Sequence, residues 1–170
     1  EINDVDKMVK EAEEYMKWGD NVVIKTPLNI PGLKTTKILT DMGIKTNVTA
    51  CMSVNQAVLA AKAGGTYTSL FMNRIGDIGH DPVDVIKDTV NIFKQYNFKS
   101  KIIIGSIRLL MDINRAALTG ADVITVPPQF FHDMTKHPRT DYTLNEFSEF
   151  WENYKKEQAE KQPSTIPPQQ

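Results

Sequence analysis

The chain alternates between two patterns of hydrophobic residues, one typical of helices and the other of buried strands. Over residues 4–18 apolar side chains recur every three or four positions, which predicts an amphipathic helix. Short apolar runs bounded by glycine, proline or polar residues predict strands. Five such strands are expected, over residues 22–25, 44–50, 66–72, 101–106 and 122–126.

Helical spacing returns after the predicted strands. The expected helices cover residues 32–42, 56–61, 82–96, 111–119, 130–135 and 144–156, and residues 74–80 are expected to form a loop. Ser53 can begin the second of these helices, because its hydroxyl can accept a hydrogen bond from a backbone N–H. Strands that alternate with helices in this way predict an α/β fold with a parallel sheet covered by helices.

Two architectures fit this alternation, an open doubly wound sheet and a closed (β/α)₈ barrel. No glycine-rich dinucleotide-binding motif follows any predicted strand, which weakens the doubly wound alternative. A complete barrel usually takes about 250 residues, whereas this chain has 170. A barrel would therefore lack its first three strands here. The domain is expected to span residues 1–158, with a polar, proline-rich and disordered tail over 159–170.

Composition removes several classes of partner. The chain has 20 basic and 21 acidic residues and a net charge of −1, so neither nucleic acid nor an anionic membrane is indicated. Cys51 is the single cysteine, which excludes an intramolecular disulfide and is expected to be a small buried hydrophobe. No apolar run approaches the roughly 20 residues that span a bilayer. A cytoplasmic protein is expected, and the three histidines lack metal-ligand spacing.

Lys25 is the first candidate for chemistry. It follows three consecutive apolar residues and precedes Pro27 by two positions, so it is expected at the carboxyl end of a strand. Parallel α/β folds keep their active sites at that end. An apolar surrounding would favour the free amine, which makes Lys25 a candidate Schiff-base nucleophile. The alternative is a lysine whose ammonium group simply reaches solvent.

Polar side chains also end the next three predicted strands. They are Asn47 and Thr49, then Ser69 with Arg74, then Ser106 with Arg108. In a closed barrel these strand ends would meet at one face. Two guanidinium groups and a hydroxyl suit a phosphate monoester, so an amine beside them indicates a phosphorylated carbonyl substrate. Alternatively, the arginines are solvated and the strand-end residues only satisfy backbone groups.

Several segments carry a family resemblance. They are 22–27 (VVIKTP), 43–49 (GIKTNVT), 56–64, 69–74 (SLFMNR), 105–108 (GSIR), 120–127 (GADVITVP), 137–138 and 147–151. In order and spacing they resemble the small transaldolases and the closely similar fructose-6-phosphate aldolases. The resemblance covers nearly the whole chain apart from the tail.

The resemblance implies a class I aldolase on a (β/α)₈ barrel, of which this chain would carry about strands 4 to 8. Lys25 would form a Schiff base with fructose 6-phosphate or sedoheptulose 7-phosphate and pass a dihydroxyacetone unit to an aldose phosphate. No metal or organic cofactor would be needed. Asn47 and Ser69 match positions that hold the donor's hydroxyls, and Thr49 matches one that positions the catalytic water. The phosphate-binding set would be Arg74, Ser106 and Arg108.

The chain also departs from the family pattern. The Asp-Thr-Ala segment that supplies the cleavage aspartate is absent, as is the Thr-Asn-Pro segment of the following strand. Glu1 stands near the expected distance upstream of Lys25 to be the water-activating carboxylate. Ser-Leu-Phe-Met-Asn-Arg replaces the commoner Ser-Pro-Phe-Val-Gly-Arg. Phe71 and Glu1 favour a transaldolase, since the aldolases tend to have tyrosine and glutamine there, whereas Asn73 favours the aldolases.

Three functional hypotheses remain open from the sequence. The first is a transaldolase of the pentose phosphate pathway, the second a stand-alone fructose-6-phosphate aldolase, and the third an inactive barrel fragment whose sheet edges are open. An aromatic stripe over residues 144–154 indicates a helix that docks on another surface. The resemblance implies a homo-oligomer, a pentamer or decamer.

Overall fold

The computed structural model describes residues 3–161 of the chain. These residues fall into two units that meet in sequence between Pro127 and Pro128. The first unit contains the sheet, and the second contains two helices. Glu1, one of the residues singled out from the sequence, lies outside the described residues.

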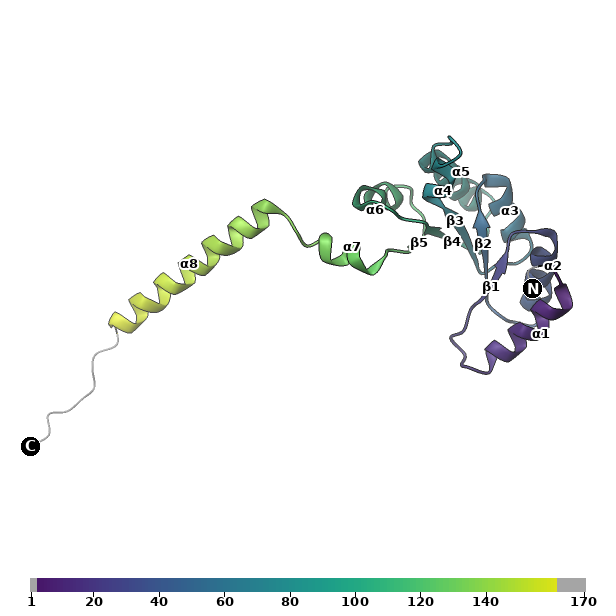
Figure 1. The fold of residues 1–170 in the computed structure, drawn as a ribbon, viewed down its shortest axis with the longest axis horizontal. Coiled ribbons are helices and arrows are strands. Elements are labelled where there is room, and N and C mark those ends of the chain that lie inside the picture. The colour runs from purple at the N-terminus through teal and green to yellow at the C-terminus, as the bar shows by residue number, and fades with distance from the viewer. Residues whose placement is uncertain (1–2, 162–170) are drawn as a thin grey trace, which may run out of the picture. The chain divides into compact units, whose positions relative to one another are not determined.

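The first unit is built on a parallel sheet whose strands follow chain order (Figure 1). The strands are β1 (Ile24–Pro27), β2 (Thr46–Cys51), β3 (Tyr67–Phe71), β4 (Lys101–Gly105) and β5 (Val123–Ile124). Each strand pairs in parallel with the next. The predicted α/β fold with five parallel strands is confirmed.

Helices precede or connect these strands, and four of them begin at a side chain that caps the first turn. They are α1 (Val5–Met16), α2 (Ile30–Asp41), α3 (Val54–Lys62), α4 (Met72–Gly76), α5 (Pro82–Gln95) and α6 (Leu110–Ala117). Asp4, Asn29, Ser53 and Asp81 each accept a hydrogen bond from a backbone N–H in the first turn of the helix that follows. The predicted cap at Ser53 is confirmed.

One face of the sheet is covered by helices and forms the core. Alternate residues of a strand point to opposite faces of the sheet. On this face the side chains of β1 to β4 are buried: Ile24, Thr26, Thr46, Val48, Thr68, Leu70, Ile102 and Ile104. Ile24 packs with Ala12 of α1 and Leu39 of α2. The hydroxyl groups of Thr26 and Thr36 hydrogen-bond at 2.7 Å and join β1 to α2.

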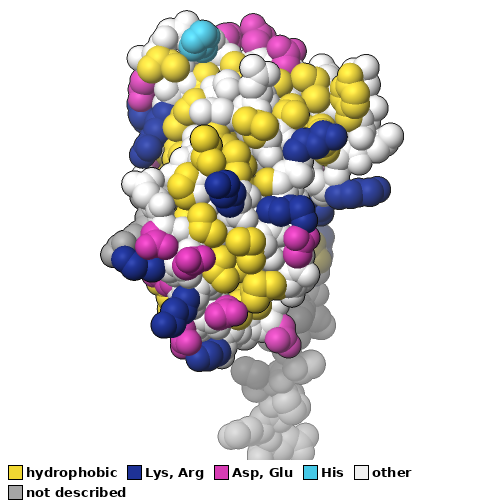
Figure 2. Space-filling view, turned by 90° about the vertical axis from the view of Figure 1, so that its right-hand side faces the viewer, with side chains coloured by type: hydrophobic (Ala, Val, Ile, Leu, Met, Phe, Trp, Pro, Cys, Tyr) yellow, Lys and Arg dark blue, Asp and Glu magenta, His cyan; other side chains and the backbone are white. Residues whose placement is uncertain are grey.

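The outer surface of these helices is chemically mixed. Figure 2 shows hydrophobic side chains interspersed with acidic and basic ones on the face that it presents. None of the helices within residues 3–161 is long and apolar enough to cross a membrane.

Several predicted boundaries are wrong. β1 begins at Ile24 and includes Pro27, because a proline at the end of an edge strand breaks no hydrogen bond of the ladder. Residues 72–76 form α4, where the sequence predicted the end of a strand and the start of a loop, since Met72 and Ile75 are buried three positions apart on one side of a helical turn. β5 has two residues where five were expected.

The second unit consists of α7 (Pro128–Asp133) and α8 (Pro138–Lys161). α8 is longer than the predicted helix and includes residues 159–161, which the sequence placed in the tail. The rest of that predicted tail, residues 162–170, lies outside the described residues. The predicted stripe of aromatic residues and one leucine lies on α8 and is exposed: Leu144, Phe147, Phe150, Trp151 and Tyr154. The Trp151 and Tyr154 rings stack with centroids 5.6 Å apart.

Candidate active site

The sheet face opposite the core carries the polar residues that the sequence singled out. Lys25 of β1 pairs in register with Asn47 of β2, and Pro27 pairs with Thr49. Ser69 and Phe71 of β3 lie on the same face, because they are two and four positions from Tyr67, the register partner of Asn47. The side chains of neighbouring strands are then about 5 Å apart. The fold therefore brings Lys25, Asn47, Thr49, Ser69 and Phe71 together on one face.

A hydrogen bond fixes the orientation of the Asn47 carboxamide. The Ser69 hydroxyl donates to Asn47 Oδ1 at 2.7 Å, and Ser69 is only 3% exposed. The Asn47 Oδ1 atom is thus engaged, whereas the Asn47 Nδ2 group makes no hydrogen bond within residues 3–161 and can donate to another partner. Such an oriented donor can bind a hydroxyl or carbonyl oxygen of a ligand.

The Thr49 hydroxyl is the unusual polar group of this face. Thr49 Oγ1 is buried and has no hydrogen-bond partner in the described part of the chain. The backbone is irregular directly after it, where Ala50 has a φ of 66° and the register of β2 and β3 shifts. Buried hydroxyls are normally paired, so an unpaired one beside Asn47 is suited to hold a water molecule or a ligand atom.

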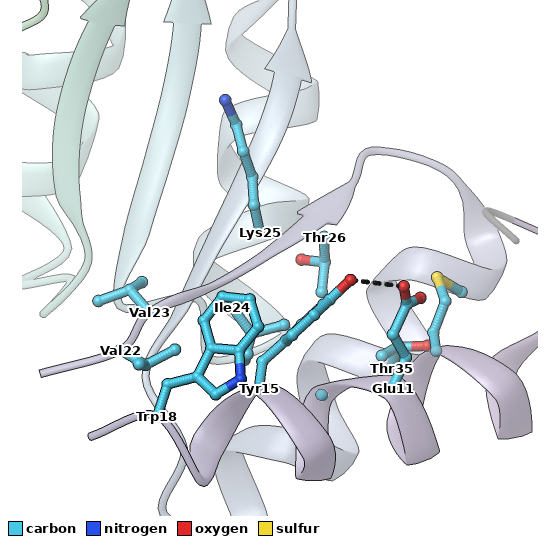
Figure 3. Close-up of a pocket in the computed structure, with 11 residues that line it drawn as sticks. Glu11, Tyr15, Trp18, Val22, Val23, Ile24, Lys25, Thr26 and Thr35 are labelled. Atoms are coloured by element: carbon cyan, nitrogen blue, oxygen red, sulfur yellow. Dashed lines mark hydrogen bonds between the residues drawn. The ribbon is translucent and has the colours of Figure 1, made fainter. Parts of the chain in front are cut away.

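The Lys25 side chain stands clear of the helices. It is exposed, and Figure 3 shows it extending away from the Tyr15 and Trp18 rings. The expected apolar surrounding of Lys25 is therefore wrong for the described chain. The reason is that β1 is an edge strand, so the lysine has a neighbouring strand on one side only.

An apolar pocket of about 450 Å³ also touches Lys25. It is lined mainly by residues of α1 and of the segment that leads into β1, including Tyr15, Trp18, Val22 and Val23 (Figure 3). Asn47 and Ser69 are not among its lining residues. We therefore place the candidate site on the polar sheet face rather than in this pocket, because the donors and hydroxyls converge on that face.

Arg74 lies in the turn that follows β3. Its guanidinium carbon is 5.0 Å from the centroid of the Phe71 ring, which is within cation–π distance. A Cβ atom on Gly105 would lie 3.3 Å from Phe71 Cδ1. Glycine at the end of β4 thus leaves room for the ring under the arginine.

Arg108 follows β4 and is engaged by a carboxylate. Its two terminal nitrogens donate to the two oxygens of Asp77 at 2.7 and 2.8 Å. This bidentate pairing lowers the pKa of Asp77 and raises that of Arg108. The positive charge of Arg74 also lowers the pKa of Asp77. The two arginines therefore share one acidic neighbour, but only Arg108 binds it directly.

Ser106 occupies a left-handed backbone conformation, with a φ of 63°. Its carbonyl oxygen accepts from Asn73 Nδ2 at 2.7 Å, and the same nitrogen donates to Asp112 Oδ2 at 2.7 Å. Asp112 Oδ2 also accepts from the backbone N–H groups of Arg108 and Leu109, at 3.1 and 2.9 Å. Burial alone would raise the pKa of Asp112, but these donors lower it.

Sequence reasoning missed Asp77 and Asp112. Asp112 had a local signal, because it is the third residue of α6, where a carboxylate can accept from the N-cap backbone N–H. Asp77 had no local signal, since its partner is 31 positions away. No group of three or more histidine, cysteine, aspartate or glutamate residues within residues 3–161 is placed to hold a metal ion.

The described residues thus define a parallel α/β protein with an amine, a carboxamide and two hydroxyls on one sheet face and two arginines in the loops beyond it. The chain belongs to the transaldolase/fructose-6-phosphate aldolase family, whose model matches residues 2–166.

Individual relatives agree with this assignment. A "Probable transaldolase" from Anaeromyxobacter sp. (strain Fw109-5) is 44% identical over 153 residues, which cover 90% of this chain and 71% of the relative. Proteins of the same name from Streptococcus equi subsp. zooepidemicus and Streptococcus pyogenes serotype M5 are 44% and 45% identical over 151 residues, or 89% of this chain and 71% of each relative.

Proposed function

We propose that the full-length protein is a transaldolase that moves a dihydroxyacetone unit from a ketose phosphate to an aldose phosphate through a Schiff base on Lys25. The observation that carries the proposal is the shared sheet face of Lys25, Asn47 and Ser69, on which Ser69 fixes the Asn47 amide. The donor would be fructose 6-phosphate or sedoheptulose 7-phosphate. Membership in the family and the name of the relatives support this assignment.

The proposed reaction begins when the Lys25 amine adds to the C2 carbonyl of the ketose. Loss of water gives a protonated imine, which accepts the electron pair when the C3–C4 bond breaks and the first aldose leaves. The remaining enamine carbon attacks the second aldehyde and forms the new bond. Water then hydrolyses the imine and frees Lys25, so no cofactor is consumed. The carboxylate that moves the proton during C–C cleavage is not assigned in this chain.

The other residues of the site would have the roles that the family resemblance implies, and the contacts on this sheet face are compatible with them. The oriented amide of Asn47 and the hydroxyl of Ser69 would bind hydroxyl groups of the donor. The unpaired hydroxyl of Thr49 would hold the water that hydrolyses the imine. Glu1, outside the described residues, would activate that water. The Phe71 ring has no hydroxyl to orient water, which favours transfer over hydrolysis.

Arg74, Ser106 and Arg108 would bind the phosphate group of the sugar. The two guanidinium groups follow neighbouring strands, and planar guanidinium groups bind phosphate oxygens in pairs. In the described state Asp77 occupies the Arg108 guanidinium. A phosphate dianion that bound the same pair of nitrogens would replace this carboxylate.

The strand order supports a barrel. Crossovers between parallel strands are right-handed, so a sheet in the order β1-β2-β3-β4-β5 places every connecting helix on the same face. A doubly wound sheet instead reverses its strand order once to cover both faces. The polar face of this sheet would then become the interior of a closed barrel. We propose that β1 to β5 are strands 4 to 8 of a (β/α)₈ barrel.

A fructose-6-phosphate aldolase is the second candidate, because the family includes both activities and Asn73 departs from the commoner motif toward the aldolases. The two functions differ in the acceptor. A transaldolase passes the three-carbon unit to erythrose 4-phosphate, whereas the aldolase releases free dihydroxyacetone.

Assembly and location also belong to the proposal. The exposed aromatic side chains of α8 would bury against another copy of the chain in a homo-oligomer, a pentamer or decamer by resemblance. The protein would act in the cytoplasm on sugar phosphates, and nucleic acid would not be a partner. The third hypothesis, an inactive barrel fragment with open sheet edges, would apply to residues 1–170 expressed alone.

The test is chemical trapping in the full-length protein. Borohydride reduction in the presence of fructose 6-phosphate is expected to add the three-carbon unit to Lys25, as measured by peptide mass spectrometry. Lys25→Met should carry no adduct and should lose turnover. An active protein whose Lys25 peptide stays unmodified would refute the Schiff-base role. Products formed with and without erythrose 4-phosphate would then separate transaldolase from aldolase.

A further inference from the structure

Asn73 and Asp112 connect the two segments after β3 and β4 that carry the candidate phosphate ligands. Asn73 lies in α4, directly before Arg74, and Asp112 lies in α6, four positions after Arg108. One nitrogen of Asn73 donates to both the Ser106 carbonyl and Asp112 Oδ2, each at 2.7 Å. The contact spans 39 positions in the sequence, so it is a tertiary link rather than part of either helix.

The link holds a backbone segment that would not keep its conformation unaided. A non-glycine residue with a φ of 63°, as at Ser106, is strained and persists only when its surroundings hold it in place. Asn73 binds the carbonyl of this residue, and Asp112 binds the N–H groups of Arg108 and Leu109. The backbone of residues 106–109 is therefore held through one carbonyl group, that of Ser106, and through two N–H groups.

Asp112 is placed to make this arrangement stiff. It is 4% exposed, and its Oδ2 accepts three of the four hydrogen bonds of the network, from Asn73 and from the N–H groups of Arg108 and Leu109. Hydrogen bonds to a charged acceptor are stronger than neutral ones, and their loss leaves buried donors unpaired. Arg74, in α4, and Arg108, in the loop after β4, thus belong to two segments that one carboxylate and one amide link beyond the paired ends of β3 and β4.

We propose that Asn73 and Asp112 are positioning residues that set the spacing of Arg74, Ser106 and Arg108 for the phosphate group of the substrate. This inference rests on the proposed function, because it takes a sugar phosphate as the ligand. Neither residue contacts the substrate. Their effect is to keep the three ligands in a binding geometry before the phosphate arrives, so that binding does not have to order the loop.

A simpler role is helix capping, since Asp112 also ends the first turn of α6. Loss of a purely capping role would lower stability and would change the kinetic constants for phosphorylated and unphosphorylated substrates by the same factor. Positioning of phosphate ligands would instead separate the two kinds of substrate. The test therefore compares fructose 6-phosphate with fructose and also measures the binding of inorganic phosphate.

The variants are Asn73→Gly, Asp112→Ala and the conservative Asp112→Asn in the full-length protein. For Asn73→Gly and Asp112→Ala we expect the KM for fructose 6-phosphate and the dissociation constant of inorganic phosphate to rise about 10-fold, as for the loss of one to two hydrogen bonds. The kcat for fructose 6-phosphate and the kcat/KM for fructose should each change by less than about 3-fold. Asp112→Asn keeps an oxygen acceptor in place and should restore phosphate binding to within about 3-fold of the parent. Asn114→Ala, an exposed position of the same helix, is the matched control.

The outcomes separate this inference from the proposed function. Equal losses with fructose and fructose 6-phosphate, or lower thermal stability with unchanged phosphate constants, would overturn the positioning role. If Lys25 is trapped in every variant but phosphate binding never changes, the positioning role fails and the proposed function stands. If Lys25 is never trapped but phosphate binding depends on Asn73 and Asp112 as described, the positioning role stands and the proposed function fails.

Discussion

Asp77 is paired with Arg108, which is also a candidate ligand for the phosphate group. Its carboxylate holds the Arg108 guanidinium in a bidentate pair, and both side chains are about half exposed, 51% for Asp77 and 50% for Arg108. A phosphate dianion presents the same kind of oxygen pair to the same donors. Asp77 is therefore a competitor for the candidate phosphate site and not one of its ligands.

Replacement of Asp77 by asparagine is expected to strengthen phosphate binding. The KM for fructose 6-phosphate should fall by about 2- to 5-fold, a modest change because exposed ion pairs are weak. Asp88→Asn removes the same charge from an exposed position of α5 and is the control. Equal changes in the two variants would show a general charge effect. No change in Asp77→Asn would mean that Asp77 does not compete with the phosphate for Arg108.

This effect should depend on pH only in the acidic range where Asp77 titrates. Arg108 lowers the pKa of Asp77, so the ion pair is fully formed above the ordinary carboxyl value, near 3.8. It is lost as the pH falls through the lower value of the folded protein. The ratio of the sulfate dissociation constants of the parent and Asp77→Asn should therefore be constant from pH 5 to 8, where sulfate, unlike phosphate, does not change its charge.

Cys51 provides a second prediction at this scale. Its side chain is fully buried, and burial raises the pKa of the thiol to about 12. At pH 8 only about one thiol in 10⁴ would be ionised, and the thiolate is the reactive form. Iodoacetamide should leave Cys51 unmodified in the native protein and should alkylate it within minutes in guanidinium chloride. Rapid native alkylation, measured by mass spectrometry, would contradict this burial.

At the scale of single residues, local sequence was informative where a role depends on strand position. Lys25, Asn47, Thr49 and Ser69 were singled out as polar residues at the ends of predicted strands, although Asn47 and Ser69 lie within β2 and β3 rather than at their carboxyl ends. Their grouping on one face is a consequence of register, whereas their roles stay predictions. Asp77 could not be found in this way, because its partner comes from a loop that only the fold brings near.

At the scale of elements, α2 lies unusually close to the strand that carries Lys25. A Cβ atom on Gly32, in the first turn of α2, would lie 1.9 Å from the carbonyl oxygen of Pro27 at the end of β1. Backbone atoms cannot move aside as a flexible side chain can. Glycine at this position thus allows the helix to pack directly on the end of β1.

Gly32→Ala is therefore expected to destabilise the fold and to displace the end of β1. Overpacking of this kind costs about 1–3 kcal/mol, measured as the change in free energy of unfolding in urea. Gly76→Ala is the control, because a Cβ atom there would meet nothing within 4 Å. A Gly32→Ala protein as stable as the control would show that α2 can move away from Pro27 without cost.

Element boundaries were harder to predict than element types. Val22 and Val23 have strong strand preference, but the strand starts at Ile24, where the first pairing with β2 occurs. α4 was missed because Gly76 and Gly79 indicate a loop, while the burial of Met72 and Ile75 that stabilises the turn is tertiary. Pairing and burial between distant segments override local preference in both cases.

At the scale of the whole molecule, periodicity predicted the parallel α/β class but not the closure of the sheet. Helix and strand spacing are local properties, so their alternation is visible in the sequence. Closure depends on what lies beside β1 and β5, the outer strands of the described sheet. The order of the strands favours a barrel, and the backbone of Lys25 offers a direct test.

The N–H of Ile24 in β1 donates to the carbonyl of Lys45, directly before β2. The N–H of Leu28, directly after β1, donates to the carbonyl of Thr49 in β2. Successive residues of a parallel strand direct their backbone groups to opposite sides, so the N–H of Lys25 points to the open edge. In a closed barrel it would bond to another strand. We expect the Lys25 amide of the full-length protein to exchange with deuterium at least about 100-fold more slowly than an exposed amide, as followed by NMR. The amide of Thr26, which faces β2, is the internal control. Fast exchange at Lys25 with slow exchange at Thr26 would mean that β1 remains an edge, and the barrel would be refuted.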